Sequence, residues 1–80
     1  MPRYYFDLSD STGTAIDEEG LELRDLEAVQ DEAARALGDM TRDAARSRRG
    51  SAPERMSIEV RDDTGPVMQV RFSFEIERKN

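Results

Sequence analysis

A chain of 80 residues without cysteine or histidine can form neither a disulfide framework nor a metal site with thiolate or imidazole ligands. Its length predicts a single domain, residues 1–80, near the lower size limit of a stable hydrophobic core. The formal net charge of −6 disfavours general nucleic-acid binding, because proteins that bind phosphate backbones usually present a basic face.

The apolar runs of the sequence are only a few residues long, and the N-terminal residues lack the apolar segment typical of signal peptides. We therefore expect a cytoplasmic protein that makes no contact with a membrane. The charge is uneven, since residues 1–45 hold twelve acidic and four basic residues, whereas residues 46–80 hold six and eight. Any basic surface is thus expected mainly in the second half of the chain.

The first predicted elements form a hairpin. Residues 3–8 alternate between polar and apolar side chains, which predicts a half-buried strand with Tyr4, Phe6 and Leu8 on its apolar side. Residues 9–13 are turn formers, and residues 14–17 predict a short second strand centred on Ile16. Leu21 and Leu23 follow and predict an extended connection that packs under the start of a helix.

Residues 25–49 predict one long amphipathic helix. Apolar side chains recur there at intervals of three or four residues, which places them in one stripe: Leu26, Val29, Ala33, Leu37, Met40 and Ala44. Asp25 is the predicted N-cap, and Gly50 and Pro53 predict the end of the helix. Such a stripe requires a sheet to cover.

Two further strands follow the helix. Met56, Ile58 and Val60 alternate with polar residues, and residues 62–65 predict a turn. The last strand has the clearest alternation, with its apolar face expected under the helix: Met68, Val70, Phe72, Phe74 and Ile76. We predict that truncating Phe72 or Phe74 to alanine costs about 3–5 kcal/mol. The fold class is therefore α+β, in the order ββαββ, with one long helix on one face of a four-stranded, mainly antiparallel sheet.

The two predicted hairpins share a sequence pattern. Residues 6–16 align without gaps with residues 58–68, and each segment contains Asp-x-Thr-Gly. Both a true internal repeat and convergent turn chemistry account for this likeness. Either origin predicts equivalent loops of three to five residues built on a type I turn, with Gly13 and Gly65 at positive φ.

Two short motifs suggest chemistry without completing a site. Residues 63–65 spell the Asp-Thr-Gly of aspartic proteases, but those enzymes need two such aspartates facing each other, and a hairpin turn is the better interpretation. Four residues match positions one, three, five and twelve of a calcium-binding loop, namely Asp7, Ser9, Ser11 and Glu18. The glycine that such a loop requires at position six is replaced by Thr12. We therefore predict no catalytic residues, no metal site and no cofactor, and a protein that is not an enzyme.

Basic and aromatic side chains supply the candidate interaction surface. Three arginines at the predicted helix end either complement the helix dipole or contact an anion, and the others lie on the expected outer face of the sheet. The residues of this surface are Arg3, Tyr5, Arg46, Arg48, Arg49, Arg61 and Arg71.

The chain resembles a family of short bacterial proteins classed as a domain of unknown function. The resemblance covers nearly the whole chain and rests on the start at residues 1–6, the Asp-Glu-Glu-Gly of residues 17–20 and the Asp-Leu-Glu-Ala helix entry at residues 25–28. It implies no activity. The helix entry is also similar to that of HicB-type antitoxins, whose partner is an RNA-cleaving toxin.

The absence of a polar constellation for chemistry favours a small non-enzymatic protein–protein interaction module that self-associates, so that a protein partner or a homo-oligomer is expected. Alanines at positions 28, 34, 36 and 45 widen the apolar surface of the helix and support this interpretation. The alternative is a HicB-like regulator that contacts a toxin or nucleic acid through an arginine patch.

Overall fold

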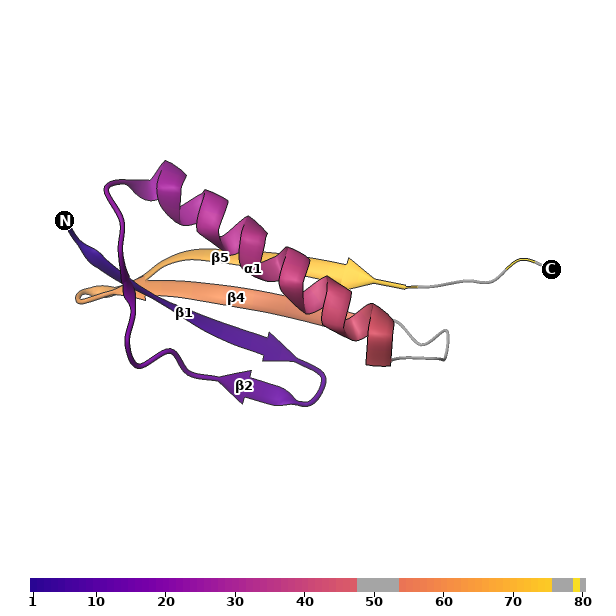
Figure 1. Cartoon of the computed structure of the whole chain (residues 1–80). Coiled ribbons are helices and arrows are strands. Elements are labelled where there is room, and N and C mark those ends of the chain that lie inside the picture. The colour runs from indigo at the N-terminus through magenta and orange to yellow at the C-terminus, as the bar shows by residue number, and fades with distance from the viewer. Residues whose placement is uncertain (48–53, 76–78, 80) are drawn as a thin grey trace.

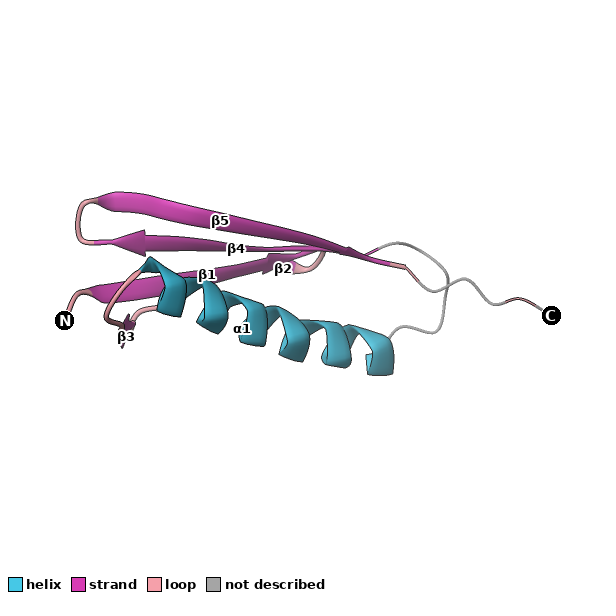
Figure 2. Ribbon diagram, turned by 90° about the horizontal axis from the view of Figure 1, so that it is seen from above, coloured by secondary structure: helices cyan, strands magenta, loops and turns pink. Residues whose placement is uncertain are grey.

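The computed structural model describes residues 1–47, 54–75 and 79, and it forms a sheet with one helix on one face (Figures 1 and 2). All strand pairings are antiparallel, in the order β2-β1-β4-β5, and β3 pairs with the other end of β1. The elements are β1 Arg3–Asp10, β2 Gly13–Ala15, β3 Leu21–Glu22, α1 Leu26–Ser47, β4 Glu54–Asp62 and β5 Gly65–Phe74. The predicted α+β class is confirmed, with β3 as a fifth, very short strand.

The core lies between α1 and the central strands β1 and β4. The predicted helical stripe supplies three buried side chains, and the alternation of β4 supplies three more, so the residues of the core are Tyr4, Val29, Ala33, Leu37, Met56, Ile58 and Val60. Leu26 belongs to the predicted stripe but is 51% exposed. Because α1 crosses the sheet diagonally (Figure 1), its middle turns cover the sheet while its first residue extends beyond the core.

The start of α1 is built as predicted. The carboxylate of Asp25 accepts a hydrogen bond from the backbone N–H of Ala28 at 2.9 Å, which satisfies one of the free donors of the first turn. The structure describes α1 as far as Ser47. The predicted end at residue 49, with Gly50 and Pro53 beyond it, lies outside the described residues.

The segment between β1 and α1 differs from the prediction in two places. β2 ends at Ala15, and Ile16, the expected centre of that strand, is 60% exposed. The reason is that the next N–H, that of Asp17, donates to the Asp7 carboxylate at 2.9 Å and so turns the chain away from the ladder. Leu21 pairs with Tyr4 in β3, whereas Leu23 packs against the core as expected.

β5 is an edge strand, and this position limits how much of its apolar face is covered. Met68 and Val70 pack partly buried against the core, but Phe72 is 38% exposed, so its predicted place in the core is wrong. An edge strand has a neighbour on one side only, and α1 contacts β4 more than it contacts β5. The side chains of Phe74 and Ile76 lie outside the described residues.

The two hairpin turns are equivalent. Gly13 and Gly65 have φ values of 142° and 134°, and no other residue of the two loops has a positive φ, which excludes the type I′ and II′ turns of many short hairpins. Each loop contains two residues, not three to five, because Asp10 pairs with Gly13 and Asp62 pairs with Gly65. In each, the first aspartate accepts the N–H of the threonine two residues later at 2.8 Å. The predicted equivalence and the positive φ values are confirmed.

Candidate functional site

The sheet face opposite α1 carries the polar side chains of the three long strands, and no helix of the described chain covers it (Figure 2). The register places Tyr5 opposite Arg61 near one end of this face. Near the other end, Ser57 of β4 lies between Ser9 of β1 and Arg71 of β5. Two polar groups result. We call Tyr5, Asp7, Asp17 and Arg61 the Arg61 cluster, and we call the hollow between Arg55 and Arg71 the Arg55–Arg71 groove.

The Arg61 cluster holds one guanidinium on three sides. Its Nε donates to Oδ2 of Asp7 at 2.9 Å, and its Nη2 donates to the backbone carbonyl of Asp17 at 2.9 Å. Its Cζ lies 4.6 Å from the centroid of the Tyr5 ring, which adds a cation–π contact. The guanidinium is thus engaged within its own chain.

Asp17 closes a gap in the edge of β1. β3 pairs with the start of β1 and β2 pairs with its end, and between them the N–H of Phe6 donates to the Asp17 carboxylate at 3.0 Å. The same carboxylate accepts the N–H groups of Glu19 and Gly20 at 3.1 and 3.0 Å. Gly20 has a φ of 74°, and a Cβ there would lie 2.8 Å from the Tyr5 ring. A side chain therefore completes an edge that backbone pairing leaves open.

Both carboxylates of the cluster favour the ionised form. The hydrogen bond from Arg61 is the largest influence on Asp7 and lowers its pKa below the ordinary value of 3.8. Desolvation raises the pKa of Asp17, but hydrogen bonds from the N–H groups of Gly20, Phe6 and Glu19 together outweigh it, and the net pKa is lowered. A general acid needs the opposite shift at neutral pH, so neither carboxylate is suited to that role.

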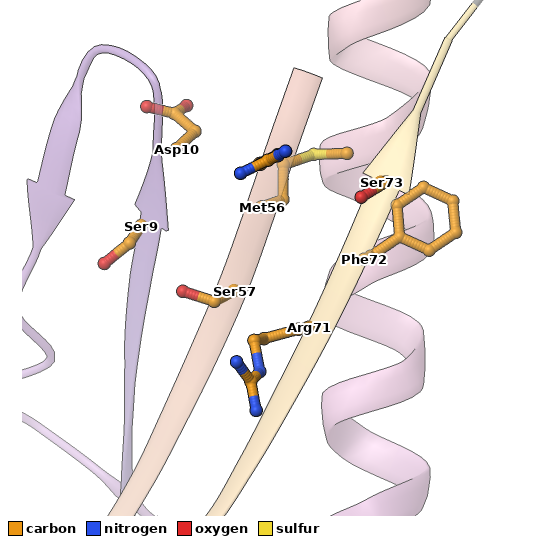
Figure 3. A pocket seen from close by; sticks show the side chains of 8 residues that line it. Ser9, Asp10, Met56, Ser57, Arg71, Phe72 and Ser73 are labelled. Carbon is orange, nitrogen blue, oxygen red and sulfur yellow. The ribbon is translucent and has the colours of Figure 1, made fainter. Parts of the chain in front are cut away.

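The Arg55–Arg71 groove lies at the other end of the same face (Figure 3). It has a volume of about 410 Å³ and is lined by Ser9, Asp10, Arg55, Met56, Ser57, Arg71, Phe72 and Ser73. Figure 3 shows the side chain of Arg71 leaving β5 toward β4, while the ring of Phe72 points away from β4. Within the described chain, neither Arg55 nor Arg71 forms an ion pair.

The predicted interaction surface is distributed over the molecule. Tyr5 and Arg61 belong to the Arg61 cluster, and Arg3 lies beside it, donating to the carbonyl of Glu19 at 2.7 Å and paired with Glu22 at 3.4 Å. Arg71 lines the groove, and Arg46 is exposed in the last turn of α1. Arg48 and Arg49 lie outside the described residues. Arg55 was missed, although its place just before the alternating residues of β4 was visible in the sequence.

The other motifs are accounted for by local structure. Asp63 is exposed in the second hairpin loop, where Asp62 makes the turn hydrogen bonds. Asp7 is the first position of the calcium-loop match, and its carboxylate forms an ion pair with Arg61. Among the described residues, no group of three or more acidic side chains is placed to hold a metal ion. In the same part of the chain, no helix has the length and apolar character needed to cross a membrane.

Comparison with protein families identifies the chain. The family model described as Domain of unknown function (DUF6894) matches residues 3–73. The chain belongs to this family. The matched region begins with β1 and ends within β5, so DUF6894 covers the sheet except for the last residue of β5, together with α1, the Arg61 cluster and the Arg55–Arg71 groove. The resemblance to a family of unknown function is confirmed, whereas the similarity to HicB-type antitoxins stays a prediction. Neither the curated proteins nor the solved structures include a match to the chain.

Proposed function

We propose that this DUF6894 chain is a non-enzymatic protein–protein interaction module that forms a homodimer through the outer edge of β5. One observation carries the proposal: the β1 edge of the sheet has hydrogen-bonded partners, whereas no described strand pairs with the outer edge of β5. The edge of β1 is closed by β2, β3 and Asp17. β5 pairs with β4 over Gly65–Phe74, and no described strand pairs with its other edge. A long edge of unpaired backbone groups is a template for another strand.

A second copy of the chain suits this edge. In an antiparallel pairing centred on Val70, Met68 of one copy lies opposite Phe72 of the other, and Gln69 lies opposite Arg71. Apolar residues then meet apolar residues on the α1 side, and the exposed ring of Phe72 is covered. A pairing centred on Arg71 is disfavoured, because it would place two positive charges directly opposite each other.

Light scattering after size-exclusion chromatography tests the dimer. Concentrations from about 1 μM to 1 mM cover association free energies of about −8 to −4 kcal/mol. Phe72→Lys should shift the equilibrium to monomer, since a lysine at an edge strand discourages pairing. Ile16→Lys is the matched control, because it charges an exposed apolar side chain beyond the opposite sheet edge and should leave the dimer intact. A strict monomer throughout the range, or disruption by Ile16→Lys alone, would refute the β5 interface.

A non-catalytic role is supported by the lowered pKa values of Asp7 and Asp17, which suit ionised carboxylates in a fixed network. A cytoplasmic location is part of the proposal, because a chain without cysteine gains no disulfide stabilisation from an oxidising compartment. The alternative regulator makes a different prediction: binding to heparin or mixed RNA that weakens steeply with salt.

A further inference from the structure

We propose that the Arg55–Arg71 groove is a binding site for a single phosphate monoester group. The arginine and serine side chains of the groove lie on the outer face of the sheet, whereas the proposed dimer uses the backbone edge of β5, and Arg71 and Phe72 belong to both surfaces. The ligand class follows from the side chains that line the groove, their register and the charges around it.

The register brings together two guanidinium groups and three hydroxyl groups. Arg71 lies opposite Ser57, and Arg55 lies opposite Ser73, so the two arginines are diagonal neighbours on adjacent strands. Diagonal neighbours lie about 7–8 Å apart, a span that two long side chains can close around one anion. Ser9 extends the row from β1, opposite Ser57. Arginine forks and hydroxyl donors are the groups that proteins use to hold phosphate oxygens.

Arg55 and Arg71 differ from the other arginines of this face, because those arginines form ion pairs. On the same face, Arg3 is paired with Glu22 and Arg61 is paired with Asp7. Arg55 and Arg71 form no ion pair within the described chain, although the protein carries a net charge of −6. Two like charges placed as neighbours repel each other, and an anion between them would remove that repulsion.

The surroundings favour a small anion over an extended polyanion. Asp10 lines the groove on the β1 side, and Glu59 follows Ser57 on the same face of β4. Glu59 is a diagonal neighbour of Arg71 and would repel a nucleic-acid backbone that continued along this face beyond the groove. The volume of about 410 Å³ is that of a small-ligand site. A monoester dianion also uses both guanidinium groups, whereas a diester carries one charge.

Backbone and arginine side-chain chemical shifts of the full chain, followed during titration with phosphoserine, test this site. We expect saturable shifts confined to residues that line the groove, with a dissociation constant of about 1 mM. Arg55→Gln and Arg71→Gln should each weaken binding by about tenfold or more, because each removes a charge-assisted contact. Arg46→Gln, which removes one exposed arginine from α1, is the matched control and should change binding by less than about twofold.

Four outcomes would overturn the assignment. Shifts that do not saturate, or equal weakening by Arg46→Gln, would mean that phosphoserine responds to charge alone. Tighter binding of a single-stranded oligonucleotide than of phosphoserine would assign the face to a polyanion. Inorganic phosphate in a parallel titration separates a free-phosphate site, which would prefer it, from a monoester site. Thermal melting of both groove variants should match the wild type, since both side chains are exposed.

Discussion

Replacing Gly20 with alanine should be more damaging than the same replacement at Gly13, Gly38 or Gly65. Gly20 has a φ of 74°, where any other residue is strained by about 1–2 kcal/mol. The added Cβ would also lie 2.8 Å from Cε2 of Tyr5, 2.9 Å from Cγ of Arg3 and 3.0 Å from the carbonyl oxygen of Tyr4. The side chains can move, but the carbonyl belongs to the ladder of β1 and β3, and such overpacking costs about 1–3 kcal/mol. The sum is about 2–5 kcal/mol.

Thermal melting of three alanine variants separates the two contributions. A domain of this size loses about 4–8 °C in melting temperature for each kcal/mol, so Gly20→Ala should melt well below the wild type. Gly13 has a φ of 142°, and a Cβ added there meets nothing within 4 Å. The melting temperature of Gly13→Ala therefore measures backbone strain alone. Gly38→Ala lies in α1 with open space around it and should stabilise by about 0.5–1 kcal/mol. A Gly20→Ala variant that melts with the wild type would refute the packing argument.

Five further variants test the core, the Arg61 cluster and the turns. Phe72→Ala should cost about 1–2 kcal/mol, less than a buried phenylalanine, whereas Ile58→Ala, at a fully buried position, should cost about 2–5 kcal/mol in urea unfolding. The folded pKa of Asp7 lies below its unfolded value, so its stabilisation is present above about pH 4 and is lost as pH falls through the folded pKa. Asp7→Asn should therefore lower stability at pH 7 and flatten its decline toward pH 2, and an unchanged acid profile would contradict the cause given for the shift. Asp62→Ala should lower the melting temperature through loss of the turn hydrogen bonds, and Asp63→Ala should not.

Features that depend on neighbours in the sequence could be predicted. Period-two alternation identified Ile58 and Val60 as core residues, and the N-cap at Asp25 follows from the chemistry of one residue. The turn glycines were predictable for the same reason, because Asp, Thr and Gly adjacent in the chain select a conformation locally. Fold class followed from the sum of these local signals.

Features that depend on strand order or on distant partners could not be predicted. Alternation assigns Phe72 to a face of β5, but it does not reveal that β5 is an edge strand, and the exposure of Phe72 follows from that position. The end of β2 was misplaced because Asp17 donates to Asp7, ten residues earlier. The arginines of the outer face were grouped as one surface because local spacing carries no information on which of them meets a carboxylate.

Register gives the arginines of one sheet face two different roles. Arg61 lies opposite Tyr5 and is a diagonal neighbour of Asp7, so the register of β1 and β4 lets it form an ion pair with that carboxylate. Arg71 lies opposite Ser57, a residue without charge, and forms no ion pair within the described part of the chain. The loop at Gly65 begins the pairing of β4 with β5, and a bulge between Val60 and Arg61 then shifts the register by one residue. A shift by one residue would turn Arg71 toward α1, so the turn and the bulge together determine which arginines remain available to a ligand.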